Sequence, residues 1–252
     1  MAGRSAGPAW RVAIAIGGAL AILGVSVVAL LDPAYIHAVL DAAGSAAILG
    51  LDRQATYAAS DRTMNELVFG PATFAFTVTP GGPPFYDASE ASHLRDASNL
   101  LHLFLVVVAA GLVVVVLGVG RYRRDPAAWR ALRTGAIVLA AAFAAIGLFF
   151  TVAFDQAFTL FHEVFFPQGN WEFNSATERM VQLYPTPFWE LIATTLAILV
   201  LALCALVWLV ATLRARSLDQ GAAIMAAGPA NPIVTPISRG PDAAGRTDGG
   251  GR

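Results

Sequence analysis

Lysine is absent from the 252-residue chain, and all 16 of its basic residues are arginine. A nucleotide-binding loop of the Gly-rich, Lys-containing type therefore cannot form. Cysteine occurs once, at Cys204 inside an apolar run, which excludes an intrachain disulfide and a multi-cysteine metal site. Only 13% of the residues are charged and the net charge is −1, so the composition offers no basic surface for nucleic acid. Apolar residues make up 57% of the chain, which predicts a membrane protein.

Four uncharged apolar runs are long enough to cross a membrane as helices. A spanning helix needs roughly 20 apolar residues, because the hydrocarbon layer is about 30 Å thick. The runs that meet this length are 12–31, 100–119, 135–154 and 191–213. The sequence therefore predicts an all-α polytopic membrane protein with four transmembrane helices. The first run is interpreted as a span and not as a cleaved signal peptide, because it exceeds the usual length of about 7 to 15 apolar residues.

Arginine placement predicts the orientation of these spans, because arginine-rich loops stay on the cytoplasmic side of a membrane. The short segment after the second run carries five arginines, and the tail after the fourth run begins with two more. The two long segments between runs contain more acidic residues than arginines. We therefore expect segments 1–11, 120–134 and 214–252 to be cytoplasmic, and segments 32–99 and 155–190 to form a small extracytoplasmic cap.

Local propensities predict several elements outside the spans. The first outer segment should contain a helix at 52–69, a strand at 74–78, where aromatic and β-branched residues gather, and a turn at 79–84 in the sequence TPGGPP. A further helix is predicted to begin with Ser89 as its N-cap and to continue into the second span. The tail from residue 217 is rich in Ala, Gly, Pro and Asp without periodicity, which predicts disorder.

Three of the four histidines lie near predicted membrane boundaries. His93 and Asp96 are three residues apart on one helix face, so the carboxylate can orient the imidazole. His102 follows His93 by nine residues, which places it on the opposite face and argues against a shared metal ion. The alternative interpretation of His93 and Asp96 is a solvated helix end, and that of His102 is packing inside the helix bundle.

The second outer segment opens with an aromatic helix. In FDQAFTLFHEVFF, at 154–166, phenylalanines recur at helical spacing, and the neighbouring stripe carries Asp155 and His162. We expect this helix to lie in the membrane interface, with its aromatic face among lipid headgroups and His162 at the depth of an acyl ester. The alternative is an aromatic stripe that only anchors the chain. Asn170 and Trp171 follow the helix.

These residues are compatible with three classes of function. Two outer histidines, each with a carboxylate on its own helix face, suit proton transfer near neutral pH. No HExxH or GxSxG motif occurs, which excludes the zinc-protease and serine-elbow arrangements. A metal-dependent lipid hydrolase that uses both histidines and a carboxylate as ligands is an alternative. So is a non-enzymatic assembly or sensing protein whose aromatic stripe binds a partner.

Taken together, the motifs resemble one bacterial membrane family. FDQAFTLFHEVFF, the Asn170–Trp171 pair and YPTPF before the last span are similar to segments of the lipoprotein intramolecular transacylases, called Lit. The resemblance also covers ASHLRDASNLLHLF at 91–104 and MNEL at 64–67, and it runs from about residue 12 to residue 213. It implies four helices under an outer cap, in the bacterial cytoplasmic membrane.

The resemblance also implies an activity. Lit transfers the sn-2 acyl chain of a lipoprotein's diacylglycerol to the lipoprotein's own N-terminal cysteine amine, which gives a lyso-form lipoprotein without cofactor or metal. Its two histidines would fall on His93 and His162, with His162 as the principal base or nucleophile and His93 as its partner. Supporting roles in orientation or oxyanion stabilisation are implied for Asp96, Asp155, Arg95, Asn170 and Trp171. The expected partners are membrane lipoproteins with a diacylglyceryl-cysteine N-terminus and the lipid bilayer. Ester hydrolysis or acyl transfer on another lipid would use the same groups.

Overall fold

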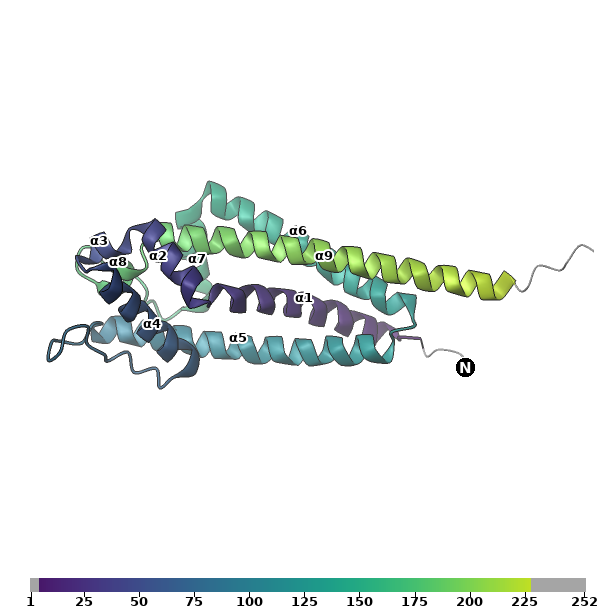
Figure 1. Cartoon of the computed structure of the whole chain (residues 1–252), viewed down its shortest axis with the longest axis horizontal. Helices are drawn as coiled ribbons and strands as arrows, with labels where there is room; N and C mark the ends of the chain where they lie inside the picture. Colours follow the sequence, from purple (N-terminus) through teal and green to yellow (C-terminus); the bar gives the residue numbers. More distant parts are fainter. Residues whose placement is uncertain (1–4, 228–252) are drawn as a thin grey trace, which may run out of the picture.

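Four long helices lie side by side along one axis in the computed structural model, which describes residues 5–227 (Figure 1). They are α1 (Pro8–Leu30), α5 (Ala88–Arg121), α6 (Pro126–Val152) and α9 (Thr186–Ala227). Each is long and apolar enough to cross a membrane. No strand occurs among the described residues. The predicted all-helical architecture with four candidate spans is therefore confirmed.

Five shorter helices gather at one end of the long ones (Figure 1); with their connecting loops, we call them the cap. They are α2 (Pro33–Ala43), α3 (Ser45–Leu49), α4 (Arg53–Phe69), α7 (Phe154–Phe165) and α8 (Arg179–Leu183). Neither α2 nor α3 was expected from the sequence. The side chain of Asp32 caps α2 by accepting a hydrogen bond from Tyr35 N at 3.0 Å, and Pro33 occupies the first turn. Gly44 ends the helix with a φ of 72°.

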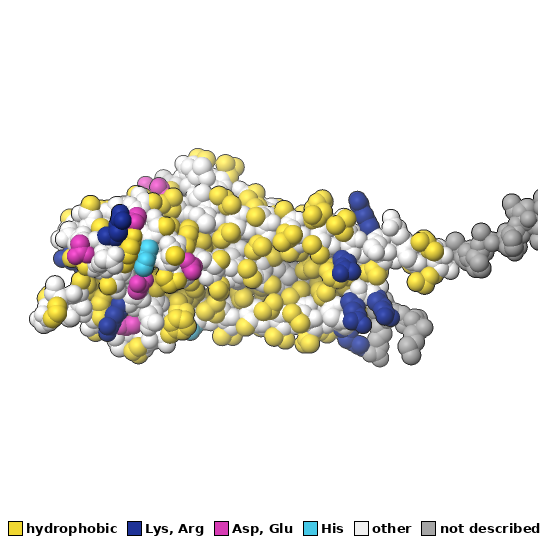
Figure 2. Space-filling model, viewed as in Figure 1, with side chains coloured by type: hydrophobic (Ala, Val, Ile, Leu, Met, Phe, Trp, Pro, Cys, Tyr) yellow, Lys and Arg dark blue, Asp and Glu magenta, His cyan; other side chains and the backbone are white. Residues whose placement is uncertain are grey.

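The long helices present apolar side chains on their outer surface. Only 6% of the most apolar window of α5 is buried inside the molecule, and Leu103, Val106 and Val113 are each more than half exposed. Figure 2 shows hydrophobic atoms along the shaft, with a cluster of arginines at one end and a mixture of acidic, histidine and arginine side chains at the other. An apolar surface of this extent fits a hydrocarbon surrounding and not water.

Glycines allow α1 to approach its two neighbours closely. A Cβ added at Gly17 of α1 would lie 2.6 Å from the carbonyl oxygen of Gly111 in α5. A Cβ added at Gly135 of α6 would lie 2.2 Å from the carbonyl oxygen of Ala15 in α1. Small residues at such crossings stabilise helix pairs in lipid through close backbone contact. α1 is thus packed between α5 and α6, and α6 packs in turn against α9.

The cap has one hydrophobic core that both outer segments build. Leu40 and Phe74 from the first segment and Leu183 from the second are almost completely buried in the same cluster. The hydroxyl groups of Ser60 in α4 and Tyr184 after α8 are 3.1 Å apart and form a hydrogen bond. The two outer segments therefore fold onto each other at one end of the spans.

Glu90 joins the two segments directly and also caps α5. Its carboxylate accepts hydrogen bonds from Met180 N at 2.6 Å and from Asp87 N at 2.8 Å. Asp87 in turn accepts from the backbone N–H groups of Ser89 and Glu90. This reciprocal capping box makes Asp87 the N-cap, so the prediction of Ser89 is wrong.

Residues 74–78 form an irregular loop, so the predicted strand is wrong. The carboxylate of Glu66 accepts from Phe74 N at 2.6 Å and from the hydroxyl of Thr73 at 2.9 Å. Phe74 adopts a φ of 52°, outside the extended region that a strand requires. Phe74 and Phe76 are both buried in the cap core, so the aromatic pattern reflects burial without strand pairing.

The last helix is longer than predicted. α9 continues to Ala227, so the prediction of a disordered tail from residue 217 onward is wrong as far as this residue. Arg130 at the start of α6 donates two hydrogen bonds to the carboxylate of Asp219, at 2.8 and 2.7 Å, and holds the extension of α9. The rest of the predicted tail, 228–252, lies outside the described residues.

Gly135→Ala is expected to lower the melting temperature of the protein in detergent micelles. The new methyl group would lie 2.2 Å from the Ala15 carbonyl oxygen, so α1 and α6 must separate. Overpacking of this kind costs about 1–3 kcal/mol. Gly147→Ala on the same helix is the matched control, because its nearest new neighbour would lie at 3.7 Å. Equal melting temperatures for the two variants would contradict the close α1–α6 contact.

Candidate active site

Two histidines that are far apart in the sequence meet where the cap joins the long helices. His93 lies in the second turn of α5, and His162 lies in the last turn of α7. Their ring centroids are 5.9 Å apart and their planes are inclined by 27°. The exposed fractions of the two residues are only 7% and 8%. The two imidazoles are therefore close enough for both to act on one small reacting group.

A backbone carbonyl determines which nitrogen of His162 carries hydrogen. Nδ1 lies 2.8 Å from the carbonyl oxygen of Phe158, one turn earlier in α7. Because a carbonyl oxygen only accepts, Nδ1 is the donor and Nε2 keeps its lone pair. The rings of Phe158 and Trp171 flank the imidazole at centroid distances of 4.1 and 5.0 Å. His162 thus offers a basic nitrogen in an apolar setting.

Aromatic rings also surround His93. The centroids of Phe166 and Phe173 lie 4.6 and 5.6 Å from that of its imidazole. Phe166 also approaches His162, at 5.5 Å, so a single ring packs against both histidines. Nδ1 of His93 is buried and has no hydrogen-bond partner of normal geometry among the described residues.

The carboxylate of Asp96 contacts the loop that follows α7. Its Oδ2 atom accepts hydrogen bonds from Nδ2 of Asn170 at 2.7 Å and from Nε2 of Gln168 at 2.9 Å. The spacing in the sequence suggested a direct contact between Asp96 and His93, but the hydrogen bonds of Asp96 go to these two amides. Asp96 therefore holds the loop against α5.

Burial keeps both imidazoles neutral at pH 7. It lowers the pKa of His93 from 6.5 to about 4, with a further contribution from the neighbouring His162, while Asn170 and Asp96 act in the opposite direction. Burial also lowers the pKa of His162, and the carbonyl of Phe158 opposes this change. Each ring is therefore present in its basic form, which can accept a proton or attack a carbonyl carbon.

Comparison with known proteins identifies the family of this chain. The sequence profile of the family described as "Lipoprotein intramolecular transacylase Lit" matches residues 18–189. The chain belongs to the Lit family. Its members are acyltransferases, so this chain is an enzyme of that class, a lipoprotein intramolecular transacylase. No curated protein matches the sequence of the chain.

Solved structures share the Lit fold with this chain at low sequence identity. The membrane-integral lipoprotein intramolecular transacylase Lit from Bacillus cereus has a TM-score of 0.69 at 15% identity, over 86% of this chain and 97% of its own. Two variants of that protein, with a histidine replaced by arginine or by alanine, have TM-scores of 0.64 and 0.65 at 16% and 17% identity. Both matches cover 86% of this chain. They cover 93% of the arginine variant and 94% of the alanine variant. With its four apolar helices, this Lit member is a multi-pass membrane protein.

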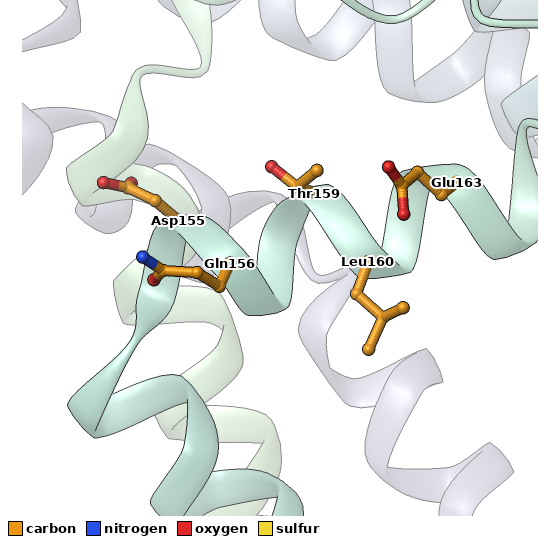
Figure 3. A pocket seen from close by; sticks show the side chains of 5 residues that line it. All are labelled: Asp155, Gln156, Thr159, Leu160 and Glu163. Atoms are coloured by element: carbon orange, nitrogen blue, oxygen red, sulfur yellow. The ribbon is translucent and has the colours of Figure 1, made fainter.

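Two other residues singled out in the Lit resemblance are exposed. Asp155 makes no hydrogen bond to His162 among the described residues, and it lines a groove of about 320 Å³ on α7. Figure 3 shows Asp155, Thr159 and Glu163 pointing to the same side of that helix. Arg95 follows His93 by two residues on α5, so its side chain points about 200° around the helix from that of His93. Arg95 is also exposed. The carboxylate and the guanidinium therefore lie outside the buried imidazole pair.

The two remaining histidines have contacts of their own. His102 places Nδ1 2.7 Å from Ser98 O and Nε2 3.1 Å from Val68 O, so it joins α5 to the end of α4 and does not pack inside the bundle. His37 lies on the cap surface with its Nε2 atom 2.7 Å from Asp61. The described residues include no group of three His, Cys, Asp or Glu side chains arranged to hold a metal ion.

The aromatic stripe of α7 has two environments in this Lit member. Phe158 is half-buried against His162, whereas Phe161 and Phe165 are 42% and 48% exposed. The expected position among lipid headgroups therefore suits the second pair, while Phe158 belongs to the surroundings of the histidines.

Several residues around the pair were not expected from the sequence. Phe166 was counted only as part of the aromatic run, and Phe173, Gln168 and Glu90 were assigned no role at the site. Their contacts depend on the loop that folds back onto α5. One available signal was the sequence PQGNWEF, in which Gly169 adopts a φ of 77° and turns the chain beside the amides.

The acid limb of the pH–activity profile is expected below the ordinary histidine pKa of about 6.5. Burial disfavours the protonated rings, so activity that needs neutral imidazole persists as the pH falls below this value and is lost only near the lowered pKa. Initial rates of N-acylation at a series of pH values in detergent micelles measure the limb.

Phe166→Ala opens His93 to water and should move this limb upward, toward the ordinary value. Phe69→Ala is the control, because Phe69 is 80% exposed and lies at the end of α4. An acid limb at or above the ordinary histidine pKa in the unchanged protein would contradict a buried, neutral pair.

Proposed function

We propose that this Lit member transfers the sn-2 O-acyl chain of a lipoprotein's diacylglyceryl group to the α-amine of the same lipoprotein's N-terminal cysteine. The product is a lyso-form lipoprotein with an N-acyl chain and a free sn-2 hydroxyl group. The proposal rests on the 5.9 Å approach of two buried, neutral imidazoles at the boundary of the cap and the long helices. Membership of the family supports the general activity.

The reaction exchanges one acyl bond for another without a net change in protons. The amine nitrogen attacks the ester carbonyl carbon, a C–N bond forms, and the C–O bond to glycerol breaks. The proton that the amine loses passes to an imidazole and then to the departing sn-2 oxygen. A neutral imidazole suits both steps, because it accepts a proton near neutral pH and its conjugate acid returns it.

His162 is the principal base or nucleophile in this proposal, and His93 is its partner. The carbonyl of Phe158 engages Nδ1 of His162, which leaves the Nε2 lone pair for the substrate. As a base, Nε2 takes the proton of the attacking amine. As a nucleophile, Nε2 takes the acyl chain as an acyl-imidazole while the C–O bond to glycerol breaks. The amine then displaces the imidazole, and His93 carries the proton that the amine loses to the sn-2 oxygen.

Supporting groups come from the loop after α7. Trp171 lies 5.0 Å from His162 and brings an indole N–H, a donor suited to the developing oxyanion. Asn170 precedes it and is bound to Asp96, so both residues help to hold Trp171 near the pair. Asp155 and Arg95 are exposed, and we assign them to positioning the substrate outside the pair. No cofactor or metal enters the proposed steps.

We further propose that the cap faces the outer side of the bacterial cytoplasmic membrane. Arginines gather at the opposite end of the shaft (Figure 2), and such ends remain cytoplasmic. The exposed ring of Phe161 lies 5.3 Å from that of His162 and 4.8 Å from that of Phe165, and the two phenylalanines would pack in the lipid interface. A membrane lipoprotein would then present its ester at the depth of the two imidazoles.

Mass spectrometry of the N-terminal lipopeptide of a reporter lipoprotein tests the activity. The reporter is co-expressed with the chain in a host that lacks its own N-acyltransferase. The unchanged enzyme should yield the N-acyl, S-monoacylglyceryl peptide, and His162→Ala and His93→Ala should each lower its formation rate about 100-fold or more. His37→Ala is the matched control, because His37 lies on the cap surface.

Full activity of His162→Ala would refute its catalytic role. A diacylglyceryl peptide that stays unmodified despite good expression of the enzyme would refute the proposed substrate. Release of a free fatty acid without an N-acyl peptide would identify a hydrolase that uses the same histidines.

A further inference from the structure

The amide of Asn170 can lie in only one of its two orientations. Its Nδ2 atom is 2.7 Å from Oδ2 of Asp96, and a carboxylate only accepts hydrogen bonds. A reversed amide would place two oxygen atoms at this distance. Gln168 also points its amide nitrogen at the same carboxylate oxygen, at 2.9 Å. Asp96 is therefore the acceptor that determines which end of Asn170 faces α5.

This orientation directs the amide oxygen of Asn170 away from Asp96. The oxygen, Oδ1, is buried and has no hydrogen-bond partner of normal geometry among the described residues, and the same holds for Nδ1 of His93. Asp96, which binds Asn170, follows His93 by three residues on α5, so the two side chains lie one above the other on the same face of the helix and Asn170 lies beside that face. A buried acceptor and a buried ring nitrogen thus lie on the same side of α5 without another partner in the part of the chain that the structure describes, and such atoms are costly to leave unpaired.

We propose that Asn170 is a positioning residue that selects the tautomer of His93, and that Asp96 acts through Asn170. Oδ1 of Asn170 accepts a hydrogen bond from Nδ1–H of His93, so Nε2 of His93 keeps its lone pair. The proposal rests on the proposed function for its catalytic meaning, but the tautomer itself is a property of the resting protein.

The selected tautomer has a consequence for the pair. The carbonyl of Phe158 already leaves Nε2 of His162 without hydrogen. If both Nε2 atoms carry lone pairs, no hydrogen bond can join them, and both remain free for a proton that the substrate brings. A direct contact from Asp96 would also orient His93, but its charge would favour the protonated ring. The neutral amide orients the ring without adding a charge beside it.

Nitrogen NMR of the protein labelled with 15N-histidine, in lipid nanodiscs without substrate, tests the tautomer directly. Comparison with His93→Gln assigns the His93 signals. We expect a protonated Nδ1 and an unprotonated Nε2 for His93 in the unchanged protein. Hydrogen on Nε2 would overturn the proposal, and this result does not depend on whether the protein transfers acyl chains.

An exchange of the two side chains tests the role of the relay in catalysis. Asp96→Asn no longer fixes the orientation of Asn170, because an amide at position 96 can either accept or donate a hydrogen bond, so we expect kcat to fall about 100-fold or more with a smaller change in KM. In Asp96→Asn/Asn170→Asp, an oxygen again faces Nδ1 of His93 and an amide donor stands behind it. This double variant should recover activity relative to Asp96→Asn, and its acid limb should lie at higher pH, because a carboxylate now favours protonated His93.

A purely structural role would give neither the recovery nor the shift. An exchange variant that folds but is no more active than Asp96→Asn would overturn the relay. An unshifted acid limb in an active exchange variant would do the same. Asp61→Asn is the matched control, since Asp61 also faces a histidine, His37, on the cap surface away from the site. It should leave both kcat and the pH profile unchanged.

Discussion

The docking of the second outer segment onto the first turns of α5 is the contact on which the site depends. Two carboxylates of this helix hold that segment: Glu90 binds the backbone of Met180, and Asp96 binds the amide of Asn170. Phe166 in the same segment packs against both imidazoles. His162 stands at the end of a short helix, so these tertiary contacts set its distance from α5. The site therefore forms only when the cap folds.

The apolar surroundings of the histidines suit the chemistry proposed for them. Aromatic rings bury both imidazoles and disfavour their protonated forms, so each ring is a base at neutral pH. The same rings limit the access of water, which would otherwise compete with the amine for the acyl group. Selecting the tautomer of each ring with a neutral acceptor, a carbonyl at His162 and an amide at His93, orients the nitrogens without adding a charge that would favour the protonated ring. Burial, orientation and neutrality thus act together.

Much of the fold could be predicted from the sequence, because spans are determined locally by length and apolar content. His93 and His162 could also be singled out, since each shares a helix face with a carboxylate. The distance of 5.9 Å between their ring centroids could not be predicted, because two spans separate the segments that carry the two histidines. The strand at 74–78 was mistaken because burial of Phe74 and Phe76 in a loop produces the same composition as a strand. The true partners of Asp96 lie in a loop whose path no local pattern reveals.

A double-mutant cycle on kcat/KM for N-acylation tests most directly whether the two histidines act as one unit. The cycle uses His93→Gln, His162→Gln and the double variant, each purified and shown to fold by its melting temperature. If one imidazole works through the other, the loss in the double variant equals that of the slower single variant, because removing either residue already disables the pair. Losses that multiply, so that the double variant is slower by the product of the two single effects, would contradict a shared site.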